Sequence, residues 1–430
     1  MLTNSNIHEV VDLYLAKDPA TIEKYGHIST WNTSQITSME ALFKDRAEFN
    51  ENITRWDTSN VINMSHMFQN AKKFNQPIGT WNTSKVQTMS HMFYNTNLFN
   101  ANISNWDTSN VINMSHMFYN TAKFDQPLEW TKTSNLENTN YMFYHATMFD
   151  REISWNTPKL VSVRAMFFGA TAFNSLITWD TSNIETMGYL FNNAHNYNQP
   201  VDHWNTSKVK NMESMFQNAK KFNQSLKKWN VENVETMKCM FFNARSFDHN
   251  VKCWDVYNCD DFDKMFKDAT KFQLKYNAPN TPMYLFFSVP LTDGNIYDAI
   301  KMWFSDKENA EKIYGHIDMW DVCAVTKMDG LFKDRKEFNE NLTLWDTSNV
   351  ISMREMFMNA LSCDCNIDYW EVSNVKDFTR IFDNSPMKAP WYSEPTPLRR
   401  STVFKSASEN RPKQTLPLVM GKSKKLRFFA

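Results

Sequence analysis

Glycine is scarce in this sequence. Only 8 glycines occur among 430 residues, which argues against a glycine-rich phosphate-binding loop. No run of apolar residues is long enough to cross a bilayer, so we expect no transmembrane segment. The first residues have neither the basic start nor the long apolar core of a secretory signal. We therefore do not expect secretion by a classical signal peptide.

Cysteine is also sparse, and its 6 copies all lie in the second half of the chain. Their spacings match no zinc-binding template, so a reduced interior is the expected setting, with Cys363 and Cys365 as ordinary thiols. His66 and His116 recur in the context Ser-His-Met-Phe, and we predict them to be surface residues on a helix. The chain contains no Ser-His-Asp set, HExxH motif, Walker loop or paired-carboxylate pattern. We predict no enzymatic activity and no catalytic residue, cofactor or metal site.

Charge is nearly balanced overall but unevenly distributed. The net charge is −1, yet the segment from Pro386 onward has ten Lys and Arg residues against two acidic ones. This segment also holds six of the 14 prolines and no repeat pattern, so we predict an extended tail that docks on a partner protein. Contact with nucleic acid or an anionic membrane, and a purely solubilising role, remain open for it. The candidate tail contacts are Arg399, Arg400, Lys422, Lys424, Lys425 and Arg427.

What the sequence has in abundance is one repeated unit, typified by Trp56 to Trp81, WDTSNVINMSHMFQNAKKFNQPIGTW. Thirteen copies occur, and their tryptophans are mostly 24 or 25 residues apart. Residues at the same place in successive units form what we call a column, and the most uniform column holds Phe43, Phe68 and Phe93. Self-similarity at this period is typical of a solenoid.

Two periodicities are visible within each unit. Apolar residues alternate around the tryptophan, which predicts a short strand, with Trp56 and Thr58 inward and Asp57 outward. Met64, Met67, Phe68 and Ala71 then follow a three-and-four spacing that predicts a short helix. The predicted fold class is an α/β repeat solenoid, leucine-rich-repeat-like, with one short parallel strand and one short helix per 25-residue coil.

The order of the units predicts two solenoid segments. Ile7 to Trp31 and Ile296 to Trp320 have equal length and share Tyr-Gly-His-Ile before the tryptophan, which indicates a duplicated cap. The predicted organisation is an N-terminal helical cap at 1–30, a ten-coil solenoid at 31–272, a Pro-containing linker at 273–295, a second cap at 296–319, a three-coil solenoid at 320–385 and a basic Pro-rich tail at 386–430.

The pattern W-D-T-S-N-V-x-x-M-x-x-M-F resembles the repeat of BspA-like leucine-rich-repeat surface proteins, copies of which also occur in large DNA viruses. The resemblance implies a leucine-rich-repeat-type solenoid and a role in adhesion or protein interaction. The chain departs from the bacterial members because it has no lipobox cysteine or anchoring motif. That departure favours an intracellular or virion location.

The residue after each tryptophan is acidic or an amide almost throughout. This column is either a recognition strip on a concave face or a set of side chains that satisfy turn backbones. The candidate strip contains Asp57, Asn82, Asp107, Asp180, Asn205 and Asn230.

From these features we predict a non-enzymatic protein–protein interaction or structural scaffold protein. Its expected partners are other proteins, including capsid or assembly components of a large particle such as a virion. The first alternative is a cell-surface adhesin or host-factor-binding repeat protein. A weaker alternative is a nucleic-acid-associated protein that acts through its tail.

Overall fold

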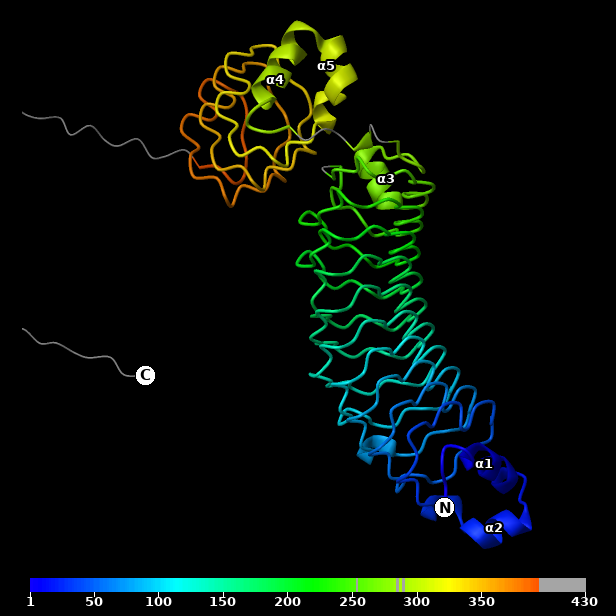
Figure 1. Ribbon diagram of the computed structural model, residues 1–430. Coiled ribbons are helices and arrows are strands. Elements are labelled where there is room, and N and C mark those ends of the chain that lie inside the picture. Colours follow the sequence, from blue (N-terminus) through cyan, green and yellow to red (C-terminus); the bar gives the residue numbers. More distant parts are fainter. Residues whose placement is uncertain (253, 284–285, 288–290, 394–430) are drawn as a thin grey trace, which may run out of the picture. The chain divides into compact units, whose positions relative to one another are not determined.

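The computed structural model describes residues 1–252, 254–283, 286–287 and 291–393. The repeats lie in one compact unit, Met1–Ala389. Within each array of repeats the coils stack directly on one another (Figure 1). The candidate tail contacts from Arg399 to Arg427 lie outside the described residues. None of the helices that the structure describes is long and apolar enough to cross a membrane.

The backbone of each coil is a series of tight turns, so the prediction of one helix per coil is wrong. The Phe43 amide donates to the Met67 carbonyl in the next coil at 2.9 Å, whereas the following amide, of Lys44, donates to Ala41 in its own coil at 3.0 Å. Left-handed residues such as Ala41 (φ 54°) and Asp45 (φ 62°) recur four apart in most coils. Such turns also bring residues three and four apart to one side, so the apolar spacing did not distinguish them from a helix.

The predicted strand at each tryptophan is also absent from the described residues. Single parallel bridges instead join successive coils a few residues after the tryptophan, as in Ser38 to Asn63 and Asn63 to Thr88. The repeats therefore build a protein of stacked coils. Each coil consists of turns, and isolated bridges join one coil to the next.

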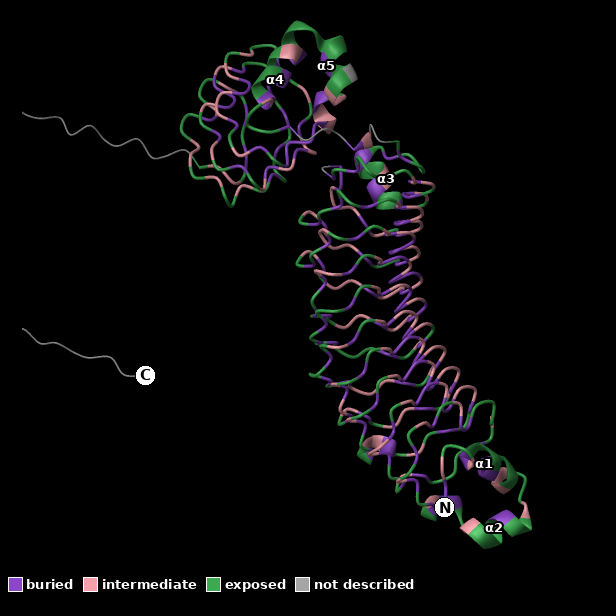
Figure 2. Ribbon diagram, in the orientation of Figure 1, coloured by how far each residue is buried: buried purple, intermediate pink, exposed green. Residues whose placement is uncertain are grey.

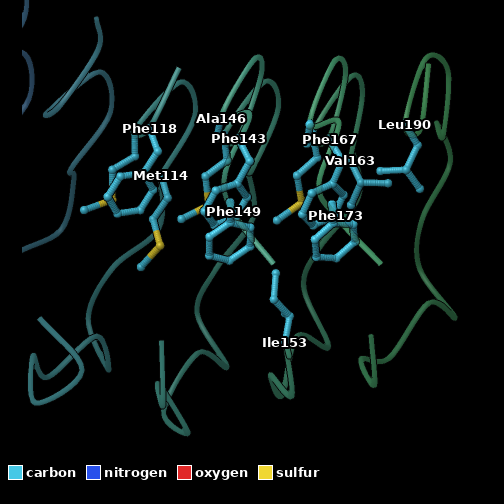
Figure 3. Close-up of a cluster of buried hydrophobic side chains, with 14 of the residues drawn as sticks. Met114, Phe118, Phe143, Ala146, Phe149, Ile153, Val163, Phe167, Phe173 and Leu190 are labelled. Carbon is cyan, nitrogen blue, oxygen red and sulfur yellow. The ribbon is translucent and has the colours of Figure 1, made fainter. Parts of the chain in front are cut away.

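Aromatic columns fill the interior, as the sequence predicts. The rings of Phe43 and Phe68 stack at 5.6 Å and 8°, and Phe68 continues to Phe93 at 5.6 Å and 5°. Within one coil Phe68 and Phe74 stack at 3.8 Å, which ties two columns together. Buried residues line the inside of the coils (Figure 2), and Figure 3 shows the packed rings of Phe118, Phe143 and Phe167 with their neighbours. Each buried side chain of this size contributes roughly 1.5–3 kcal/mol.

Polar side-chain groups bond across the interior between coils. The Trp56 indole Nε1–H donates to the Ile28 carbonyl of the preceding coil at 2.8 Å, and this contact recurs along both arrays. Thr58 is buried, as predicted, and its Oγ1–H donates to the Asn82 carbonyl of the next coil at 3.0 Å. The Ile28 carbonyl thereby gains a second donor beside the Trp31 amide, and the Asn82 carbonyl gains a donor from the preceding coil.

The helices lie mainly at the ends of the arrays. The first cap contains α1 (Ile7–Leu15), α2 (Pro19–Tyr25) and η1 (Ile28–Thr30), and the second contains α4 (Ile296–Ser305), α5 (Lys307–Tyr314) and η4 (Ile317–Met319). Two further helices lie among the described residues, η2 (Ile78–Thr80) and α3 (Thr270–Tyr276).

The two caps close their arrays in the same way. The side-chain oxygen Oδ1 of Asn4 accepts from the Thr37 amide at 2.9 Å, and Oδ1 of Asp293 accepts from the Thr326 amide at 2.7 Å. Both side chains thereby satisfy backbone groups at the start of the first coil, which has no preceding coil to pair with.

Candidate interaction surfaces

The predicted acidic and amide strip forms two runs of three neighbouring coils, Asp57 to Asp107 and Asp180 to Asn230. Each side chain accepts a hydrogen bond from the amide two residues later, so each closes its own turn. The Asp57 carboxylate accepts from Ser59 at 3.0 Å, and Asn82 Oδ1 accepts from Ser84 at 3.1 Å. The same contact is made by Asp107, Asp180, Asn205 and Asn230.

These turn contacts also affect the acidity of the strip. Hydrogen bonds from Ser59, Ser109 and Ser182 hold the pKa of Asp57, Asp107 and Asp180 below the usual value for Asp. Each of the six side chains of the strip therefore has a structural task, as the second of the two interpretations holds.

A second polar column was not singled out in the sequence. Asn70, Asn95 and Asn120 all have positive φ, near 55–61°, a conformation that Asn tolerates better than most residues. Their amides form a ladder in which Asn95 Nδ2 donates to Asn70 Oδ1 at 2.9 Å and Asn120 Nδ2 donates to Asn95 Oδ1 at 2.8 Å. The left-handed position could have been predicted from the sequence, because Asn recurs there from unit to unit.

A hollow lined by titratable side chains lies on the described surface and crosses the first coils. We call it the imidazole–tyrosine groove. It measures about 440 Å³ and is lined by Lys44, His66, Gln69, His91, Tyr94, His116, Tyr119, Tyr141 and Tyr144.

Two columns of stacked rings form this groove. The rings of His66 and His91 stack at 4.5 Å and 18°, and His91 and His116 stack at 4.3 Å and 9°. Tyr141 continues the imidazole column at 4.7 Å from His116. The parallel column stacks Tyr94 on Tyr119 at 4.5 Å, then Tyr119 on Tyr144 at 4.4 Å, and ends on Phe168 at 4.5 Å.

The groove lowers the pKa of two of its imidazoles, those of His91 and His116. Burial, followed by the nearby His116, His66 and Lys44, lowers the pKa of His91 to about 4. Burial and then His66 lower the pKa of His116. Burial, followed by Tyr144 and Tyr94, raises the pKa of Tyr119 to about 12. The Nδ1 atoms of His91 and His116 are buried and have no hydrogen-bond partner among the described residues.

The sequence interpretation of these histidines is therefore wrong. His66 and His116 lie in turns at left-handed positions (φ 60° and 59°), not on a solvent-facing helix, and both are partly buried. His66 Nδ1 is 2.6 Å from Gln69 Oε1. Sequence reasoning noted that His66 and His116 recur but missed His91, which lies between them in the same context. The signal that would have found the groove was their recurrence at the 25-residue period, beside a tyrosine column with the same period.

Neither the groove nor the rest of the described chain brings together a set of metal ligands. No group of three or more His, Cys, Asp or Glu side chains is placed to hold a metal ion within the described residues. Cys363 and Cys365 are free thiols and their Sγ atoms lie 3.0 Å apart.

Comparison with known proteins identifies the repeat. A family model described as "Mycoplasma protein of unknown function, DUF285" matches residues 16–104, 77–178, 174–278 and 298–391. These matches follow one another through both arrays and cover more than half of the chain. No curated protein and no solved structure matches the chain.

Proposed function

Because the chain belongs to the DUF285 repeat family, whose tandem units fit a protein-interaction or scaffold role in general, we propose that it is a non-enzymatic protein-interaction protein that binds through the imidazole–tyrosine groove. The observation that carries this proposal is the groove itself. It is a wide hollow with side-chain donors along its length, on a backbone fixed by bonds between coils. Rigid repeat surfaces of this kind are well suited to holding another protein.

The strip from Asp57 to Asn230 is a less favourable binding surface. One oxygen of each side chain is already used by the amide two residues later, so a partner would compete with the turn for it. In the groove, by contrast, the Nδ1 atoms of His91 and His116 have no hydrogen-bond partner among the described residues.

Site-specific photo-crosslinking tests the proposal. We would introduce benzoylphenylalanine at Tyr119, in the groove, and in a matched variant at Tyr257, which is 77% exposed and lies outside it. After irradiation in the source cells, we expect a discrete protein adduct from the Tyr119 variant and none from the Tyr257 variant. Adducts at neither position, or the same adducts at both, would refute the groove as the binding surface.

The proposal extends to the location of the protein, its family relationship and its tail. We propose an intracellular or virion location, within a large assembly, and a BspA-like leucine-rich-repeat relationship, which the 25-residue period supports. The excess of basic residues after Pro386 supports docking of the tail on an acidic partner protein. Replacing Arg399, Arg400, Lys422, Lys424, Lys425 and Arg427 by Gln should reduce recovery of the chain with its assembly, and unchanged recovery would remove the tail from the proposal.

A further inference from the structure

The imidazole–tyrosine groove has a chemistry that selects one kind of partner. We infer that it binds an extended, carboxylate-rich segment of another protein and takes up protons as it does so. This inference rests on the proposed function and adds the chemistry of the partner and its regulation.

The lining of the groove favours an anionic, hydrogen-bond-accepting ligand. Imidazoles, phenols, one lysine and one amide line it, and no carboxylate does. Lys44 adds a full positive charge at one end. Each phenol can donate an O–H, and a protonated imidazole donates from both nitrogens. Carboxylates are acceptors only when ionised, so they complement this set of donors.

The stacking determines which atoms a partner can reach. Because His66, His91 and His116 stack face to face, as do Tyr94, Tyr119 and Tyr144, the ring faces are covered by their neighbours. The ring edges, which bear the hydroxyls and the nitrogens other than the buried Nδ1 atoms of His91 and His116, therefore remain for a partner to contact. Binding is therefore by hydrogen bonds and charge along a line, which an extended segment can satisfy.

The same geometry argues against nucleic acid. Single strands are held by basic side chains along the backbone and by bases stacked on exposed aromatic faces. The groove offers one lysine, no arginine and no exposed run of ring faces.

Proton uptake follows from the crowding of the imidazoles. The titratable and charged groups that face them are Lys44, Tyr94, Tyr119, Tyr141 and the neighbouring imidazoles, none of which is acidic. In the empty groove, protonation of one imidazole is disfavoured by repulsion from the charge of Lys44 and from any protonated imidazole next to it. A bound carboxylate removes that opposition. Since binding then favours the protonated form, affinity must increase as the pH falls, as long as the ligand stays ionised.

The test uses the full chain and a fluorescein-labelled peptide of twelve residues rich in Glu. By fluorescence anisotropy we expect binding to be tighter at pH 5.5 than at pH 7.5 by about tenfold or more, because each linked proton contributes up to tenfold per pH unit. The double variant His91→Gln, His116→Gln should lose most of that pH dependence, while His203→Gln, an exposed histidine outside the groove, should keep it. Thermal melting confirms that all variants are folded at both pH values.

Several results would overturn the inference: affinity that is independent of pH, a pH dependence that the double variant retains, or preferential binding of an oligonucleotide of equal charge. If any of these occurs while the Tyr119 crosslink still captures a protein, the groove binds a partner of different chemistry and only this inference fails. If the crosslink also captures nothing, the proposed function fails with it.

Discussion

The indole Nε1–H of Trp229 donates a hydrogen bond of 2.8 Å to the backbone carbonyl of Val201, in the preceding coil. The neighbouring Trp204 is buried to the same degree but its Nε1–H has no partner among the described residues. One coil earlier still, the Trp179 Nε1–H also has no partner among the described residues, and the Ile153 carbonyl accepts from the Thr178 amide at 2.8 Å. The indole bond is therefore absent at two successive tryptophans of the first array.

This pair of tryptophans gives a matched test of the indole bond. Trp229→Phe should destabilise the chain by about 0.5–1.5 kcal/mol more than Trp204→Phe, because only the first removes an indole hydrogen bond, while the Val201 carbonyl keeps its bond from the Trp204 amide. Both variants lose similar apolar area, since the two side chains are 4% and 3% exposed. Urea denaturation followed by fluorescence measures the difference. Equal losses would mean that the indole bond contributes nothing.

The phenylalanine column should be the most sensitive part of the interior. Phe118 is fully buried and stacks on Phe93, Phe124 and Phe143, so Phe118→Ala should cost about 3–5 kcal/mol. Leu98→Ala, at a side chain 49% exposed, should cost under about 0.5 kcal/mol. Denaturation midpoints measure both changes, and comparable losses would contradict an interior built on the rings.

The closed turns predict a distinction between amide and apolar replacements. Asp57→Asn retains an oxygen for the Ser59 amide and should be nearly neutral, whereas Asp57→Ala loses that bond and should cost about 0.5–2 kcal/mol, as at a helix cap. Thermal melting at neutral pH separates the two variants. A larger loss for Asn than for Ala would contradict the turn role.

The imidazole stack predicts a dependence of stability on pH. The pKa of His91 is lowered to about 4 in the folded chain, so below the ordinary value of 6.5 the unfolded state binds the proton more readily. The contribution of His91 to stability is therefore complete above that ordinary value and is lost as the pH falls toward 4. His91→Gln should flatten the plot of unfolding free energy against pH in this window. An unchanged slope would contradict a buried, neutral His91.

The sequence predicted the repeat, the buried columns and the duplicated cap because each depends only on recurring side chains. Phe43, Phe68 and Trp56 are all interior, as their spacing requires. It did not predict the path of the backbone, since turns with left-handed residues at His66 and Asn70 space the interior residues as a helix does. The groove escaped notice for a related reason: the recurring histidines were assigned to a solvent-facing helix, whereas the turns stack them across coils.

The account depends most directly on the bonds between coils, and through-hydrogen-bond NMR couplings in the deuterated protein measure them. The Phe93 amide lies 2.9 Å from the Met117 carbonyl, in the next coil. We predict a scalar coupling between the Phe93 amide nitrogen and the Met117 carbonyl carbon. A coupling from Phe93 to the carbonyl of Met89, as in an α-helix, would contradict it.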